Sequence, residues 1–129
     1  MIVLDANVLI GLFDPADTHH ARAEALLLAH ADEPLMTSTL TLAEFLIRPS
    51  ALGVAAKALL FVANIGIIVA PLLSDDASHL ASVRAITGLK MPDAVVLWLA
   101  QSSACKLATM DHHLATAACQ LGVEVVVTN

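Results

Sequence analysis

Four carboxylates lie at points where an apolar segment of the chain gives way to a turn or to a new helix. They are Asp5, Glu44, Asp93 and Asp111, and they are far apart in sequence. Two unit charges about 4 Å apart repel each other by about 4 kcal/mol at an effective dielectric constant of about 20. A cluster of carboxylates without basic partners is tolerable mainly where a divalent cation neutralises it. These residue types therefore indicate a metal site built from oxygen ligands.

Each of these acids can also be interpreted as a helix-capping residue. Asp is favoured at helix N-caps, and the helix dipole stabilises negative charge in the first turn. Asp5 and Asp111 fit N-cap positions, and Asp93 fits an early helical position. Thr41 and Glu44 have the spacing of a capping box, although the surrounding segment is so apolar that a carboxylate there needs a strong partner. Capping and catalysis are compatible, because a helix N-terminus also orients a carboxylate.

Short apolar runs alternate along the chain with periodic segments of helical length. The expected strands are residues 2–4, 35–38, 67–70, 106–109 and 124–127. The expected helices are residues 7–13, 17–31, 41–49, 50–64, 74–87, 92–102 and 111–121. This alternation predicts a three-layer α/β/α fold with a central, mostly parallel sheet. Ligands bind such sheets beyond the carboxyl ends of the strands, where we expect the four acids to meet.

Local signals set the expected ends of the helices. We expect Asp17, Thr41, Ser50 and Ser74 to open helices, Pro49 to close one, and Gly66, Gly88 and Gly122 to act as stop signals. In the helix over residues 17–31, the spacing of Ala21, Ala25 and Leu28 predicts one apolar face.

Length and composition predict one domain that spans residues 1–129. The chain is 58% hydrophobic with a mean hydropathy of +0.80, and this surplus of apolar residues suggests buried contacts in a homodimer. The apolar stretch 51–73 contains Lys57 and Pro71 and has no uninterrupted run of about 20 apolar residues, so we expect no membrane helix. The first residues lack a basic signal-peptide region and predict a cytoplasmic protein.

Several other residues have simple structural interpretations. Cys105 and Cys119 are too few for a disulfide framework or a zinc site and are expected to be small buried apolar residues. Met91 is expected in the core and Trp98 at a core or subunit contact. The pairs His19-His20 and His112-His113 are expected at solvated helix starts, with His113 close enough to Asp111 to touch a substrate.

Four segments carry a resemblance to a known family. Val3-Leu4-Asp5-Ala6-Asn7-Val8-Leu9-Ile10 resembles the opening motif of PIN-domain ribonucleases, and Thr41-Leu42-Ala43-Glu44, Pro92-Asp93-Ala94 and Thr109-Met110-Asp111 resemble their second, third and fourth motifs. The order and spacing match across essentially the whole chain. The length and plan are similar to those of VapC-like toxins of type II toxin–antitoxin modules. The resemblance implies an endoribonuclease that depends on Mg²⁺ or Mn²⁺ and is paired with a small antitoxin protein.

The resemblance also implies roles for individual residues. By motif, Asp5, Glu44, Asp93 and Asp111 form the acidic catalytic site, with Asn7 and Thr109 as supporting polar residues. We expect Asp5, Asp93 and Asp111 to be the metal ligands, with Asp5 and Asp93 closest to the ion. Asp111 and Glu44 could also act through water or orient the nucleophile. Hard oxygen ligands favour Mg²⁺ or Mn²⁺, and one or two ions would activate a water molecule and stabilise the leaving oxygen of an RNA phosphodiester. The expected products carry a 5′-phosphate and a 3′-hydroxyl.

The charge of the chain departs from what an RNA-cutting enzyme would suggest. The formal net charge is −6, with only six Lys and Arg residues, so bulk electrostatic attraction to nucleic acid is not expected. Individual contacts to the substrate backbone would come from Arg22, Arg48, Lys57, Arg84 and Lys90. A dimer could join two weak basic patches, and apolar helices early in the chain could form the dimer contact or an antitoxin groove.

Two other functions fit parts of the pattern. The first is a PIN-like interaction module that keeps its acids as helix caps and acts through protein partners. The second is a phospho-accepting receiver domain, which is also an α/β fold with acids at strand ends. A receiver expects paired acids after the first strand and a lysine after a late strand. Asp5-Ala6 lacks the pair, and residues 123–129 contain no lysine, which argues against the receiver.

Overall fold

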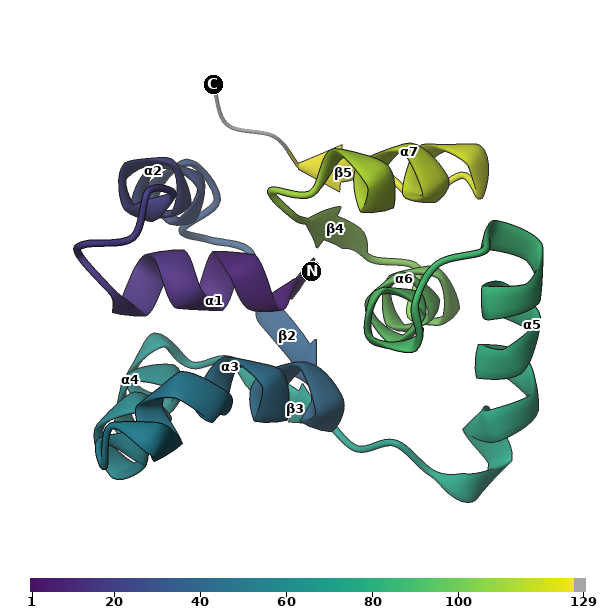
Figure 1. Ribbon diagram of the computed structural model, residues 1–129. Helices are drawn as coiled ribbons and strands as arrows, with labels where there is room; N and C mark the ends of the chain where they lie inside the picture. Colours follow the sequence, from purple (N-terminus) through teal and green to yellow (C-terminus); the bar gives the residue numbers. More distant parts are fainter. Residues whose placement is uncertain (127–129) are drawn as a thin grey trace.

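A parallel β-sheet forms the centre of the molecule in the computed structural model, which describes residues 1–126 (Figure 1). The strands are β1 (Ile2–Leu4), β2 (Leu35–Ser38), β3 (Ile68–Ala70), β4 (Lys106–Ala108) and β5 (Val125–Val126). Their order across the sheet is β3-β2-β1-β4-β5, and each neighbouring pair is parallel. Because β1 lies in the middle, the residue that follows it is surrounded by the other strand ends.

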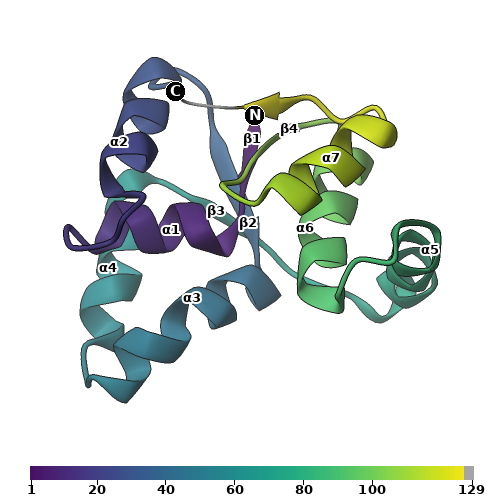
Figure 2. The same ribbon diagram turned by 45° about the horizontal axis from the view of Figure 1, so that its top comes forward.

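Helices cover both faces of the sheet. They are α1 (Ala6–Phe13), α2 (His20–Ala29), α3 (Thr39–Ala51), α4 (Ala55–Ile65), α5 (Ala77–Thr87), α6 (Met91–Ser102) and α7 (His112–Gln120), with a 3₁₀ turn η1 over Ser74–Asp76. Helices α1 to α4 lie on one side of the sheet and α5 to α7 on the other (Figures 1 and 2). The predicted three-layer α/β/α fold with a parallel sheet is confirmed.

Alternating side chains of the strands pack into two separate hydrophobic cores, one on each face of the sheet. Ile2 and Leu4 of β1 pack into the core beneath α1 to α4, whereas Val3 packs into the core beneath α5 to α7. Leu107 and Ala108 of β4 divide in the same way. Successive side chains of a strand point to opposite faces, so burial on both sides is what makes these strands continuously apolar.

Helix α2 differs from the prediction in both its start and its buried face. It begins at His20, and the Asp17 side chain accepts a hydrogen bond from the His19 backbone N–H at 3.0 Å in the turn before it. The inward residues are Ala23 and Leu26, while the predicted face is exposed, with Leu28 78% accessible. The reason is a close approach to α1, because a Cβ on Gly11 would lie 3.2 Å from the Ala23 Cβ.

Helix α3 begins earlier and ends later than expected. Ser38, the last residue of β2, is its N-cap, and its Oγ accepts a hydrogen bond from the Thr41 N–H at 3.0 Å. Thr41 is therefore not the cap. Pro49 lies inside α3 and does not end it. Proline lacks an N–H and so removes one helical hydrogen bond, but the helix continues past it and the Leu52 N–H bonds Arg48 O. Ser50 also lies within α3.

The other helix signals gave mixed results. Helix α4 begins at Ala55 without a side-chain cap, and the segment opened by Ser74 starts as the 3₁₀ turn before α5. Gly66 and Gly88 end α4 and α5 in the left-handed region, with φ of 82° and 70°, as predicted. The predicted strand residue Val127 lies outside the described residues.

The expected burial of Met91, Trp98, Cys105 and Cys119 is confirmed only in part. Trp98 packs against the core beneath α5 to α7, as expected. The prediction that Met91 lies in the core is wrong, because Met91 is the first residue of α6 and is 40% exposed. Cys105 is partly buried, but Cys119 is exposed on α7, so the prediction for Cys119 is also wrong. Within the described part of the chain, every helix is too short or too polar to span a bilayer.

Candidate active site

The four acids lie on segments that leave the carboxyl edge of the sheet. Asp5 directly follows β1 and is the N-cap of α1, and Asp111 is the N-cap of α7, which follows β4. Asp93 is in the first turn of α6, and Glu44 is in the second turn of α3. The starts of α1, α3 and α6 gather around the ends of β1 and β2 (Figure 2). The fold therefore brings the four segments that carry these acids to the same edge of the sheet.

Asp5 is the most buried of the four acids, with 6% of its surface exposed. Its backbone N–H bonds Ala108 O of the neighbouring strand β4 at 3.0 Å. One carboxylate oxygen accepts a hydrogen bond from Ala6 N–H at 2.8 Å, and the other accepts one from the Thr109 hydroxyl at 2.7 Å. Asp5 is thus fixed both to α1 and to the end of β4.

Thr109 connects three segments of the site. Its hydroxyl donates to Asp5 and accepts hydrogen bonds from the Asn7 side-chain amide at 3.4 Å and from Asp111 N–H at 3.0 Å. The Asn7 side-chain oxygen in turn accepts a hydrogen bond from Met110 N–H at 3.2 Å. The two residues expected to support the site therefore join the first turn of α1 to the β4–α7 connection.

The four carboxylates differ in how firmly they are held. Asp111 Oδ1 accepts hydrogen bonds from His113 N–H at 2.8 Å and Leu114 N–H at 3.3 Å, as a helix cap does. Within residues 1–126, neither the Asp93 nor the Glu44 carboxylate has a hydrogen bond or salt bridge. Two acids are therefore held in place by hydrogen bonds, and two are left without such partners.

Burial and mutual repulsion act on these acids together. The pKa of Asp5 is raised, chiefly by burial, in spite of the opposing hydrogen bonds from Thr109 and Ala6. Burial also raises the pKa of Glu44, with further repulsion from Asp5 and Asp93. The pKa of Asp93 is raised by burial and by Asp111. Each of the four acids therefore raises the pKa of another or has its own pKa raised by another, so the four acids form one electrostatic cluster.

Basic groups near this cluster are few. His113 and Lys90 lower the pKa of Asp93, but less than burial and Asp111 raise it. Both residues are exposed, and His112 is exposed as well, as expected for a solvated helix start. Within the described residues, Lys90 and His113 therefore offset only part of the burial and repulsion that raise the pKa of Asp93.

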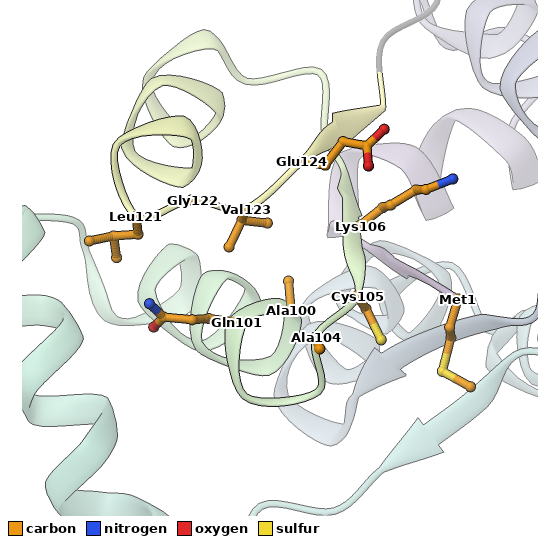
Figure 3. A pocket seen from close by; sticks show the side chains of 10 residues that line it. All are labelled: Met1, Ala100, Gln101, Ala104, Cys105, Lys106, Leu121, Gly122, Val123 and Glu124. Carbon is orange, nitrogen blue, oxygen red and sulfur yellow. The ribbon is translucent and has the colours of Figure 1, made fainter.

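The opposite edge of the sheet provides a contrast. A pocket of about 440 Å³ lies there, lined by the starts of β1, β4 and β5, with Lys106 and Glu124 extending outward from it (Figure 3). At this edge Glu33 accepts hydrogen bonds from Lys106 Nζ at 2.9 Å and from His30 Nδ1 at 2.6 Å. These bonds lower the pKa of Glu33. Glu33 at the amino edge is thus paired with basic residues, whereas the acids at the carboxyl edge repel each other.

The donor set at the carboxyl edge suits a hard divalent cation. All four side chains offer carboxylate oxygens, which Mg²⁺ and Mn²⁺ prefer. However, no three His, Cys, Asp or Glu side chains within residues 1–126 are grouped closely enough to hold an ion as they stand. The electrostatic coupling acts over longer distances than direct coordination, so the two observations are compatible. Asp93 and Glu44, which lack hydrogen bonds, would turn toward an ion.

Two of the four acids are the N-caps of helices, and two are not. Asp5 and Asp111 are helix caps, as predicted. The capping box at Glu44 is wrong, because Thr41 N–H is bonded to Ser38. Ser38 was not among the predicted caps, and its Oγ also lies 2.9 Å from the Thr41 hydroxyl in the buried start of α3. A Ser at the last position of a strand that leads directly into a helix is the signal that identifies it.

The family assignment follows from comparison with known proteins. A model of the PIN domain matches residues 2–118. The chain belongs to the PIN-domain family. The resemblance drawn from the four motifs is therefore confirmed. No curated protein gives a significant match to the sequence of this PIN domain.

Solved structures with the same fold include several toxins. VapC20 from Mycobacterium tuberculosis, described as a sarcin–ricin loop cleaving toxin, has a TM-score of 0.77 and 17% identity, with 91% of this chain and 95% of VapC20 covered. A toxin–antitoxin complex from Klebsiella pneumoniae has a TM-score of 0.72 and 23% identity, covering 86% and 87%. VapBC2 from Rickettsia felis, bound to a promoter DNA fragment, has a TM-score of 0.75 and 13% identity, covering 98% of each chain. At these identities the similarity concerns the fold.

The raised pKa values predict how Asp93→Asn changes stability with pH. A raised pKa means that the folded state binds the proton more tightly than the unfolded state, so stability falls as pH rises from the ordinary Asp value of 3.8 through the raised value. Without metal, Asp93→Asn should therefore melt at a higher temperature than the wild type at pH 7.5, and the difference should vanish near pH 3. Thermal melts in chelator measure this. A difference that does not change with pH would contradict the repulsion.

The Thr109 hydrogen bonds predict a second effect. Thr109→Val keeps the side-chain shape but removes the donor to Asp5. Loss of a group that orients a metal ligand typically weakens metal affinity by about 10- to 100-fold, and we expect that range for Mn²⁺ measured by calorimetry. Thr116→Val is the matched control, because that hydroxyl bonds only His112 O on the exposed side of α7. Equal Mn²⁺ affinity in the two variants would show that Thr109 does not position Asp5 for metal binding.

Proposed function

We propose that this PIN domain is a metal-dependent endoribonuclease and the toxin of a toxin–antitoxin pair. The observation that carries the proposal is the cluster of mutually repelling carboxylates at one sheet edge, which Lys90 and His113 offset only in part among the described residues. Membership of the PIN family and the fold shared with VapC20, described as a toxin that cleaves the sarcin–ricin loop, support the same reaction class.

The proposal assigns a role to each residue of the site. Asp5, Asp93 and Asp111 would hold Mg²⁺ or Mn²⁺, and Glu44 would orient the attacking water. A bound divalent ion supplies charge neutralisation and a water nucleophile at neutral pH. Asn7 and Thr109 keep Asp5 in place through the hydrogen bonds described above. Water attack on the phosphodiester would leave a 5′-phosphate and a 3′-hydroxyl.

Contacts to RNA in this proposal are local. Lys90 and His113 act electrostatically on Asp93 and are exposed, so they can reach a phosphate beside the carboxylates. With six Lys and Arg residues in the chain, few phosphates can be neutralised at once, and the salt dependence of binding should be shallow.

The proposed partners are a small antitoxin protein and a second copy of the chain in a homodimer. Structural neighbours of this PIN domain include complexes of a toxin with its antitoxin, which supports the first partner. Exposed apolar side chains such as Leu60, Leu73 and Ile86 support an apolar contact between copies. We place the protein in the cytoplasm, where its RNA substrate would be.

A second function is favoured by a specific observation. Asp5 and Asp111 are engaged as helix caps, and no three candidate ligands within residues 1–126 are grouped at metal-binding distance. Both features also fit a catalytically inactive PIN domain that acts through protein partners. Cleavage measured with and without metal separates the two functions.

The decisive assay is RNA cleavage by the purified protein in the presence of Mn²⁺ or of chelator. We expect cleavage with Mn²⁺, none with chelator, and products that carry 5′-phosphates. Asp93→Asn should reduce the rate by at least about 100-fold, since removing a ligand should cost no less than removing its outer support.

Asp75→Asn provides the matched control, because Asp75 is an exposed acid in the η1 turn and should leave the rate unchanged. Full activity in Asp93→Asn, or cleavage that continues in chelator, would contradict the proposed site. If the wild type cleaves no RNA with any divalent ion, the inactive interaction module becomes the better description.

A further inference from the structure

The turn between α5 and α6 is fixed at one buried residue, Leu89. Its backbone N–H donates a hydrogen bond to the Thr87 hydroxyl at 3.2 Å, and its carbonyl accepts one from the Arg84 guanidinium at 2.9 Å. The side chain of Leu89 is 1% exposed and belongs to the core beneath α5 to α7. The N–H, the carbonyl and the side chain of Leu89 are therefore all held, although the residue lies between two helices.

The groups that hold this turn come from the end of α5. The Thr87 hydroxyl also donates to Val83 O at 2.7 Å. Gly88 ends α5 in the left-handed region and donates its N–H to Arg84 O at 2.8 Å. Arg84 thus contacts the turn twice, through its backbone carbonyl and through its side chain.

Lys90 directly follows the fixed residue and is the N-cap of α6. Its backbone is extended, with φ of −62° and ψ of 154°, and its carbonyl accepts a hydrogen bond from Ala94 N–H at 2.9 Å. Its side chain makes no capping hydrogen bond and, within residues 1–126, no salt bridge. The backbone of Lys90 is therefore set, while its exposed ammonium group is available to a ligand.

Lys90 acts on the carboxylate cluster, and Arg84 does not. Burial raises the pKa of Asp93 most, and His113 and Lys90 act against it. Arg84 is not among the described groups that shift this pKa. Helix α6 lies between α5 and the sheet (Figures 1 and 2). The guanidinium that was expected to contact the substrate backbone bonds Leu89 O instead, so Arg84 can influence the site through the turn before Lys90.

A fixed backbone is an advantage for a lysine that binds phosphate. The long side chain loses rotamer freedom when it contacts a ligand, and any disorder of its backbone would add to that cost. The hydrogen bonds from Arg84 and Thr87 order the backbone before RNA arrives. In a chain with six Lys and Arg residues, a preordered turn strengthens a single phosphate contact without adding charge.

We propose that Arg84 is a positioning residue whose hydrogen bond to the Leu89 carbonyl orients Lys90 toward an RNA phosphate beside Asp93. The inference rests on the proposed function, because it takes RNA as the ligand of Lys90. The phosphate flanks the cleaved bond and does not react, so Arg84 contributes to the binding of RNA and not to the chemical step. Thr87 acts in the same direction through the Leu89 N–H.

The test is a double-mutant cycle on the full-length protein with a labelled single-stranded RNA. Affinity is measured by fluorescence anisotropy with Ca²⁺ in place of Mn²⁺, and a gel checks that the RNA stays intact. Lys90→Met should weaken binding by about tenfold, as for a lost hydrogen bond to a charged group, and should reduce the slope of log affinity against log salt by about 0.7.

Arg84→Met should weaken binding by about two- to tenfold, which is the cost of ordering one side chain at an interface. In the Lys90→Met background it should have no further effect on affinity or on the salt slope, because the two residues act as a unit. A direct contact between Arg84 and RNA would instead give additive losses.

Cleavage kinetics with Mn²⁺ separate positioning from a general loss of structure. Arg84→Met should raise KM for RNA by the factor that it weakens binding, with kcat and Mn²⁺ affinity unchanged. Thr87→Val removes the other hydrogen bond to the turn and should also raise KM. It serves as the second variant in case Arg84→Met folds poorly by circular dichroism.

Lys106→Met is the matched control for net charge. It removes one positive charge at the opposite edge of the sheet, where Lys106 bonds Glu33. RNA affinity and the salt slope should stay unchanged in this variant, whereas a loss equal to that of Lys90→Met would assign the effect to net charge and overturn the proposal.

Other results would also overturn the proposal. They are additive losses in the cycle, a lower kcat or Mn²⁺ affinity in Arg84→Met, full RNA affinity in Arg84→Met or Lys90→Met, and no RNA binding by the wild type. Failure of the nuclease is distinguishable. RNA binding with the expected cycle but no cleavage would reject the enzyme and leave the role of Arg84, whereas cleavage with an additive cycle would do the reverse.

Discussion

The candidate site depends on one buried carboxylate, Asp5, which lies at the centre of a parallel sheet close to other acids. Burial is the largest influence on its pKa and raises it, against the hydrogen bonds from Thr109 and Ala6. Asp93 and Asp111 add repulsion in the same direction. An arrangement of this kind opposes folding in the absence of a counter-charge, and its usual explanation in proteins is a functional site. The hydrogen bonds of Asp5 with Ala6, Thr109 and the Ala108 carbonyl hold it in this position in spite of the burial and the repulsion.

The fold supplies that support from two directions. Apolar cores on both faces of the sheet fix β1 and β4, whose parallel pairing sets Asp5 beside the Thr109 end of β4. The helix starts then present N–H groups to Asp5 and Asp111. Asp93 and Glu44 come from helices on opposite faces of the sheet and have no hydrogen bonds in the described residues. Asp5 and Asp111 are thus held in place by hydrogen bonds, whereas the side chains of Asp93 and Glu44 are not held in this way.

Much of this arrangement could be predicted from the sequence, because it depends on local patterns and strand topology. Continuous apolar strands between helical segments indicated a parallel sheet, and Asp5 and Asp111 at strand ends followed from it. Tertiary packing decided the rest. The buried face of α2 was set by the approach of Gly11 to Ala23, which no periodicity in α2 reveals. Ser38 displaced Thr41 as the cap because β2 leads directly into α3.

In the proposed site, a divalent ion occupies the space between these carboxylates. Diffraction from crystals grown with Mn²⁺, measured at the manganese absorption edge, would locate such an ion. We expect an anomalous peak about 2 Å from carboxylate oxygens of both Asp5 and Asp93, with Asp93 turned toward Asp5. Well-ordered crystals with no peak at this edge of the sheet, or with manganese bound only elsewhere, would contradict it.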